Sequence, residues 1–260
     1  MALSTLIAAP LEVRGRKVML VDDPPIDMLP DGNDQPLRQF KIKTAASIVR
    51  RNSASLLLKA RYGWRGYQTS ALPTDPEANR ITLTALSEGV VIGTISIGLD
   101  GIEGLAVDAT FGDIIGDIRK SGRRVCEFTK LAVDPMAGTK RVLAALFHVA
   151  YIVAHRMRGF ELLVMEVNPR HTKYYERMVG AKVLCEGRTN KDVNAPSVLL
   201  TVDFDYVREQ VGRLGGHPEL VASERSIYAQ FFSLREEAGI IAKLLETSNK
   251  QTSVSLATRA

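Results

Sequence analysis

The chain has 260 residues, of which 45% are hydrophobic and 24% charged, and its formal net charge is +5. This composition is that of an ordinary globular protein, and the length allows one large or two small domains. The mild positive charge permits an acidic partner without requiring one. Because aromatic residues make up only 6% of the chain and do not alternate with basic ones, nucleic acid is not expected as a partner.

Neither a targeting segment nor a membrane segment is expected. The apolar stretch 2–10 is short and lacks a basic lead, so it is not typical of a signal peptide. No run reaches the ~18 apolar residues of a membrane helix. The two cysteines, Cys126 and Cys185, have neither a disulfide-framework nor a metal-ligand spacing. We therefore expect a cytoplasmic protein with no metal and no bound cofactor.

Hydrophobic periodicity predicts strands and helices along most of the chain. The predicted strands are residues 40–44, 81–87, 90–97, 125–133, 161–167, 181–187 and 198–204. The predicted helices are residues 47–62, 108–120, 141–157, 171–179 and 219–245. Mixed elements joined by hairpins favour an α/β (mixed α+β) fold, with a central mixed, mostly antiparallel sheet flanked by helices.

The same pattern divides the chain into four segments. Residues 1–38 are rich in turn clusters and are expected to form an N-terminal arm. Residues 39–206 form the main domain, and residues 207–246 form a C-terminal helical extension. The polar end of the chain, 247–260, is expected to be disordered.

The stretch 125–159 predicts a strand, a short loop and a long apolar helix. Asp134-Pro135 ends the strand, because the residue before proline avoids helical geometry and proline donates no ladder hydrogen bond. A strand that leads through a loop to a helix N-terminus favours anion binding, since unpaired N–H groups converge there. The loop is therefore a candidate binding site.

A carboxylate, Glu127, lies inside this apolar strand. Alternation places it on one face with Thr129, Leu131 and Val133, and places Lys130 on the opposite face. Such a carboxylate either acts on a substrate or pairs with a nearby Arg or Lys and holds strands together. Both interpretations stay open from the sequence.

Two stretches resemble known acyltransferases. "CEFTKLAVDP", from Cys126 to Pro135, is similar to the Glu-x-(Ser/Thr)-(Arg/Lys)-aliphatic-Ala-Val strand of acyl-homoserine lactone synthases. "VNPRHTKYYERMVGAK", from Val167 to Lys182, resembles the Asn-x-x-Ala-x-x-x-Tyr segment of acetyltransferases, and Tyr175 matches its tyrosine. With "RYGWRGY" and "DIRKSGRRVCEFTKLAVD", residues 40–205 resemble the long-chain N-acyl amino acid synthases of the FeeM type, on the GCN5-related N-acyltransferase (GNAT) fold.

The resemblance implies transfer of a fatty acyl chain from an acyl carrier protein to the amino group of an amino acid, often tyrosine. The donor is then acyl-phosphopantetheine, with acyl-CoA as the alternative. Members that use coenzyme A carry several glycines in the loop, whereas 136–141 has one. A loop with few free N–H groups suits a single phosphate better than a pyrophosphate. The implied acyl and pantetheine ligands are Leu131, Ala132, Val133, Gly138, Thr139, Lys140 and Arg141.

The reaction would be aminolysis of a thioester, which requires a group that takes a proton from the amine. Glu127 is the candidate base, either directly or through a water. Tyr175 is the candidate donor to the leaving thiolate, although a tyrosine on a short helix is also typical of a core. Lys130 and Trp64 are candidate acceptor-binding residues, with a surface lysine and a packing tryptophan as the alternatives.

Basic residues near this stretch are candidates for docking an acidic carrier protein. They are Arg123, Arg124, Arg156 and Arg158, beside the loop residues Lys140 and Arg141. Three alternative functions remain: an acyl-homoserine lactone synthase, an acyl-CoA-dependent N-acetyltransferase, and a non-catalytic module that binds a carrier protein or lipid.

Overall fold

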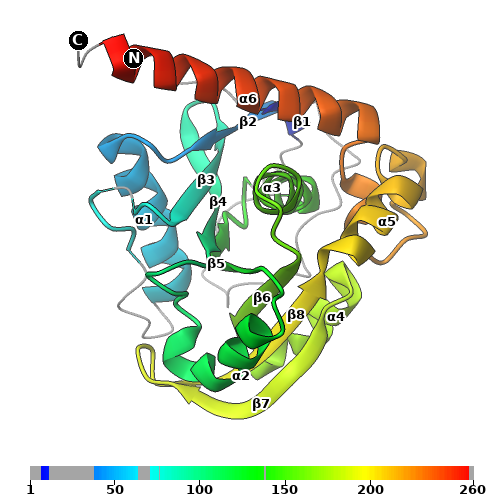
Figure 1. Cartoon of the computed structure of the whole chain (residues 1–260). Coiled ribbons are helices and arrows are strands. Elements are labelled where there is room, and N and C mark those ends of the chain that lie inside the picture. The colour runs from blue at the N-terminus through cyan, green and yellow to red at the C-terminus, as the bar shows by residue number, and fades with distance from the viewer. Residues whose placement is uncertain (1–6, 12–37, 64–70, 76, 138, 258–260) are drawn as a thin grey trace.

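The computed structural model describes residues 7–11, 38–63, 71–75, 77–137 and 139–257 (Figure 1). Two residues expected at the site, Trp64 and Gly138, lie outside these ranges, as does most of the predicted N-terminal arm. Within the described ranges, no helix is long and apolar enough to cross a membrane.

The strands form one eight-stranded sheet in the order β1-β2-β3-β4-β5-β6-β8-β7. Neighbouring strands are antiparallel except for β5 and β6, which are parallel. The strands are β1 (Ile7–Leu11), β2 (Arg38–Thr44), β3 (Arg80–Ser87), β4 (Val90–Leu99), β5 (Val125–Val133), β6 (Leu162–Val167), β7 (Lys182–Asn190) and β8 (Ala195–Asp203). The predicted mixed, mostly antiparallel sheet is confirmed, and β1 adds an edge strand from the predicted arm.

Helices cover both faces of this sheet. They are α1 (Ile48–Tyr62), α2 (Asp108–Lys120), α3 (Lys140–Tyr151), α4 (Thr172–Val179), α5 (Phe204–Leu214) and α6 (Leu234–Ala257). The sheet curves between α1 and α2 on one side and α3 and α5 on the other (Figure 1). Separate buried clusters lie under α1 and under α2, whereas one large cluster joins α3, α4 and α5 to the opposite face.

Local signals in the sequence explain where several helices begin and end. Ser47 caps α1 by accepting a hydrogen bond from the Arg50 N–H, and Thr139 caps α3 by accepting one from the Val142 N–H. Gly180 ends α4 with a φ of 69°, a left-handed conformation that glycine adopts without strain. These caps fix the start of α3 and the end of α4, two helices beside the site.

The region after β8 differs from the prediction. A single helix over 219–245 is wrong, because α5 ends at Leu214 and α6 begins only at Leu234. The helix α6 continues to Ala257, into the segment 247–260 that was predicted to be disordered. Ile240 packs into the large core, so the first half of α6 is held by tertiary contacts. Adding further turns to an anchored helix costs little, even with polar residues.

Candidate active site

The sheet opens between β5 and β6. Their parallel pairing ends at Glu127 and Val164, although β5 continues to Val133 and β6 to Val167. A cavity of about 320 Å³ lies at this opening, lined from α1, β5, β6, α4 and the β7–β8 hairpin. The two strands therefore leave a gap in the sheet with side chains from five elements around it.

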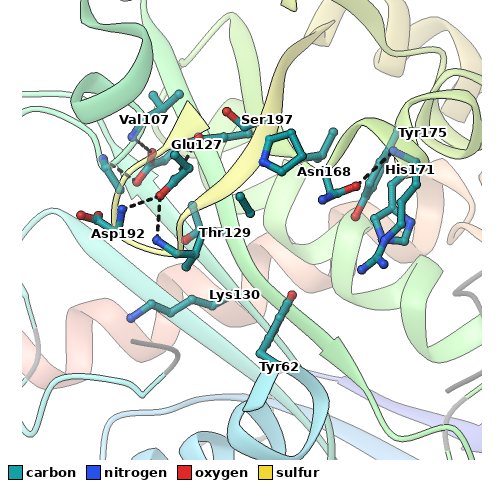
Figure 2. Close-up of a pocket in the computed structure, with 18 of the residues that line it drawn as sticks. Tyr62, Val107, Glu127, Thr129, Lys130, Asn168, His171, Tyr175, Asp192 and Ser197 are labelled. Atoms are coloured by element: carbon teal, nitrogen blue, oxygen red, sulfur yellow. Dashed lines mark hydrogen bonds between the residues drawn. The ribbon is translucent and has the colours of Figure 1, made fainter. Parts of the chain in front are cut away.

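The cavity joins the two faces of the sheet. Val164, the last paired residue of β6, packs with Val125 in the core under α2, whereas Tyr175 packs in the core under α3. In Figure 2, Glu127 lies on one side of the cavity and Tyr175 on the other. The cavity is therefore lined by residues that belong to both faces of the sheet.

Glu127 is buried and fully engaged, with 1% of its surface exposed. Its Oε1 accepts hydrogen bonds from Arg80 Nη2 at 2.9 Å and from the Ala106 N–H at 3.1 Å, and its Oε2 accepts one from the Val107 N–H at 3.0 Å. Gly98 lies opposite on β4, where a Cβ would come within 2.6 Å of the Glu127 Cγ. This geometry favours the second interpretation of Glu127, as a paired carboxylate that holds elements together.

A salt-bridge network holds the turn that carries the Ala106 and Val107 N–H groups. The Arg119 guanidinium donates to Asp100 and to Asp108 at 2.7 to 2.8 Å, and Asp108 Oδ2 accepts from the Leu105 N–H at 2.7 Å. These carboxylates raise the pKa of Arg119. The network connects β4 to the start of α2 and so fixes the turn that binds Glu127.

A β-bulge in β5 changes which side chains reach the cavity. Lys130 has a φ of 50°, and the register with β4 shifts between Thr94 and Ser96. The extra residue moves Leu131 and Val133 to the α3 face, so their predicted alignment with Glu127 is wrong. Lys130 lines the same cavity as Glu127 rather than the opposite face.

Lys130 reaches the cavity with one of its donors already engaged. Its Nζ donates to the Ala71 carbonyl at 2.9 Å, and burial lowers the pKa of the ammonium. Two further N–H donors remain available to a ligand. Lys130 therefore lies at the cavity, and its acceptor-binding role stays a prediction.

Tyr175 is 7% exposed, and its hydroxyl has no hydrogen-bond partner among the residues that the structure describes. Burial raises the pKa of this phenol, so that it keeps its proton at neutral pH. A second tyrosine, Tyr62 at the end of α1, donates a hydrogen bond to the Leu131 carbonyl. The sequence did not indicate Tyr62, which occupies part of the β5 edge predicted to bind pantetheine.

The loop between β5 and α3 uses several of its own N–H groups. Asp134 Oδ1 accepts hydrogen bonds from the Met136 N–H at 2.8 Å and the Ala137 N–H at 3.0 Å. Thr139, predicted as a pantetheine ligand, is buried and caps α3. The loop therefore offers fewer donors to an anion than its length suggests.

The four arginines predicted to dock a carrier protein lie away from this loop. Arg123 pairs with Asp203 at 2.8 Å, and Arg156 pairs with Glu237 at 2.8 Å. At 1.5 Å per residue, Arg156 is about 24 Å along the helix from Lys140. Arg124 donates to the carbonyl of Gly159, the residue after Arg158, at the same far end of the helix, so these four residues and Lys140 do not form one rim.

Three polar residues that sequence analysis missed also line the cavity. Glu166, on β6, accepts a hydrogen bond from Asn190 Nδ2 at 2.9 Å. Ser197, on β8, is 3% exposed, and its hydroxyl has no partner in the described part of the chain. The same signal that marked Glu127, a carboxylate inside an apolar strand, was present at Glu166.

A mostly antiparallel sheet that opens between its parallel strands, with a cavity at the opening, is the arrangement of the GNAT fold. The model of the family "N-acyl amino acid synthase FeeM" matches residues 53–203, more than half of the 260-residue chain. The chain therefore belongs to the FeeM family of N-acyl amino acid synthases and is an acyltransferase. No curated protein matches it.

Several solved structures are similar to this chain. FeeM, an N-acyl amino acid synthase from uncultured soil microbes, is 21% identical with a TM-score of 0.58, over 66% of this chain and 94% of that chain. The acyl-homoserine lactone synthase LasI is 12% identical with a TM-score of 0.43, over 64% and 91%. A probable acetyltransferase from Staphylococcus epidermidis is 12% identical with a TM-score of 0.46, over 63% and 98%.

Proposed function

We propose that the protein transfers a long-chain fatty acyl group from an acyl carrier protein thioester to the α-amino group of an amino acid. The observation that carries this proposal is the cavity through the sheet, with the unpartnered Tyr175 hydroxyl at one side and polar groups at the other. The thioester enters from the α3 side, and the amino acid enters from the α1 and α2 side.

The β5–α3 loop supports a carrier protein as the donor. Asp134 occupies two N–H groups of the loop and adds a negative charge beside the α3 N-terminus. A pyrophosphate requires many convergent N–H donors, and a carboxylate repels it. Phosphopantetheine on a carrier protein has a single phosphate and tolerates this loop better, with Lys140 and Arg141 as its cationic partners.

The chemistry follows from these positions. The amine nitrogen attacks the thioester carbonyl carbon, the C–N bond forms, and the C–S bond breaks with its electron pair on sulfur. Tyr175 keeps its proton because burial raises its pKa, so it can donate to the sulfur as charge develops there. Lys130 binds the carboxylate of the acceptor, and Trp64 remains a predicted acceptor contact.

Glu127 serves this site indirectly. Its three hydrogen bonds join β5 to Arg80 and to the turn before α2, so it fixes that side of the cavity. The carboxylate is already neutralised by the Arg80 guanidinium at 2.9 Å. We therefore assign it to positioning rather than to direct proton transfer.

The test measures amide formation with each donor. The purified protein is mixed with the twenty amino acids and either hexadecanoyl carrier protein or hexadecanoyl-CoA, and the products are identified by mass spectrometry. We expect an N-acyl amino acid, formed with a higher kcat/KM from the carrier protein. Equal rates from both donors would overturn the carrier-protein proposal.

Two further outcomes of this test separate the alternatives. An acylated lactone from S-adenosylmethionine, with no amino acid acylated, would identify an acyl-homoserine lactone synthase. Transfer of acetyl but not hexadecanoyl groups would identify an acetyltransferase. Either outcome would overturn the proposed reaction without changing the fold assignment.

A further inference from the structure

The opening in the sheet brings Thr129 and Glu166 to opposite sides of the same gap. Parallel pairing of β5 and β6 ends at Glu127 and Val164, and Thr129 and Glu166 are each two residues further along. Both line the cavity. Because side chains two apart on a strand share a face, Glu166 lies on the face of Val164, at the part of the gap that is open.

Glu166 differs from Glu127 in its charge environment. Glu127 pairs with Arg80 and uses both oxygens. Within the described ranges, the Glu166 side chain has no ion pair, and its only hydrogen bond is the one from the uncharged Asn190 amide to Oε1. Its Oε2 is therefore open to a ligand, and its negative charge is not neutralised by a neighbouring cation.

Ser197 supplies an independent observation at the same place. It lies on β8, one residue before Val198, the partner of Val167 on β6. Its hydroxyl is buried and has no partner within the described chain. An orphaned buried hydroxyl costs free energy, which a bound polar group recovers. Glu166 and Ser197 together offer an anionic acceptor and a hydroxyl, the complement of an ammonium group.

We propose that Glu166 binds the α-ammonium of the acceptor and takes the proton that frees it for attack, with Ser197 as a second hydrogen-bond partner. This inference rests on the proposed function, because it names the group that activates the amine in that reaction. Asn190 positions the Glu166 carboxylate through its hydrogen bond to Oε1.

Every proton that the acceptor loses in this reaction has a destination. The acceptor arrives as an ammonium and leaves as an amide nitrogen with one hydrogen, so it loses two protons. The first passes to Glu166 before attack and then to water. The second, lost from the tetrahedral intermediate, replaces the proton that Tyr175 gives to the sulfur. The products are the amide and the thiol, with one proton released to solvent.

The test compares charge removal at three positions in the full chain. The variants are Glu166→Gln, Glu166→Asp and Glu176→Gln, and the last removes an equal charge from an exposed residue of α4 outside the cavity. Each is assayed with hexadecanoyl carrier protein and the amino acid that the unaltered protein acylates fastest. We expect Glu166→Gln to lower kcat at least 10²-fold. Glu166→Asp should retain more activity, and Glu176→Gln should match the unaltered protein.

A second readout separates proton transfer from a structural effect. The charged and titratable groups that line the cavity with Glu166 are Tyr62, Glu127, Lys130, Arg170, His171, Tyr175 and Asp192. At high pH the amine loses its proton without help, so the defect of Glu166→Gln should shrink as pH rises toward the pKa of the amine. A defect that stays constant with pH, or a kcat that does not change, would overturn the inference.

Failure of the proposed function would look different. If the unaltered protein acylates no amino acid, the proposed function fails before any variant is compared. If it does acylate one, the unfolding temperature of Glu166→Gln shows whether that substitution destabilises the fold. An unfolding temperature equal to that of Glu176→Gln, with kcat lost, is the result that supports a direct role.

Discussion

The Arg80 guanidinium lies 2.9 Å from the Glu127 carboxylate, and the two side chains are 12% and 1% exposed. Both charges are thus paired in a place that water barely reaches. A buried pair contributes most visibly when one partner is removed, because the remaining charge is then left without compensation. Substitutions at Glu127 and at Gly98 test how much this pair and its hydrogen bonds stabilise the fold.

Replacing Glu127 by Gln should destabilise the protein by about 1–3 kcal/mol, because an amide N–H₂ cannot accept from the Val107 N–H and Arg80 keeps only the more exposed Glu77 as its counter-charge. The measurement is the free energy of unfolding in denaturant. An unchanged stability combined with complete loss of amide formation would instead favour Glu127 as the base.

Replacing Gly98 by Ala should displace Glu127, since the new Cβ would lie 2.6 Å from its Cγ and Oε1. Three hydrogen bonds hold that carboxylate, so the overlap should cost about 1–3 kcal/mol. Gly116→Ala on α2 is the control, because a Cβ there meets nothing within 4 Å. It should stabilise by up to about 1 kcal/mol through helix propensity. Equal effects of the two substitutions on the unfolding temperature would contradict this account.

The sequence predicted the central sheet, most elements and the strand that carries Glu127, because alternation and caps are local signals. Sequence analysis also named Glu127 and Tyr175, and both residues line the cavity. It did not predict the bulge at Lys130, because one extra residue leaves no mark in an apolar pattern. Nor did it predict that Arg80, 47 positions away, neutralises Glu127, since pairing across a sheet depends on tertiary register.

Tyr175→Phe should lower kcat by about 10²-fold, because the hydroxyl is the proposed donor to the leaving sulfur. The fold should not change, since the Tyr175 hydroxyl makes no hydrogen bond in the described part of the chain. The measurement is kcat with hexadecanoyl carrier protein, beside the unfolding temperature. Tyr174→Phe, at the neighbouring position on α4, is the matched control. An unaltered kcat in Tyr175→Phe would mean that the tyrosine only packs.

Arg141→Glu should weaken carrier-protein binding, because Arg141 lies in the first turn of α3 beside the loop that would meet the phosphate. Its electrostatic contribution should be screened by salt, so the difference from the unaltered protein should shrink at high ionic strength. Arg158→Glu reverses the same charge beyond the far end of the helix and should have little effect. The measurement is the dissociation constant for hexadecanoyl carrier protein at two salt concentrations. Equal weakening by both variants would place the docking surface at the far end.

His148 links α3 to α6 and should make stability depend on pH. Its Nδ1 accepts from the Phe232 N–H at 3.0 Å, so the neutral ring has its proton on Nε2, which donates to Glu237 at 3.0 Å. Burial lowers the pKa of His148. For Glu237, burial alone would raise the pKa, but the His148 hydrogen bond and Arg156 outweigh it and lower the pKa. Both groups therefore bind protons more weakly in the folded chain than in the unfolded chain.

Because both pKa values are lowered, the stability that the pair contributes is complete above the ordinary histidine pKa of about 6.5 and is lost as pH falls. The unfolding temperature should decrease below that pH, first through His148 and then, below about 4.5, through Glu237. His148→Phe keeps the stacking on Phe231 and Phe232 but cannot bind a proton. It should lower stability at pH 7 and flatten the decline between about pH 6.5 and 5. A decline as steep as in the unaltered protein would show that other groups cause the acid sensitivity.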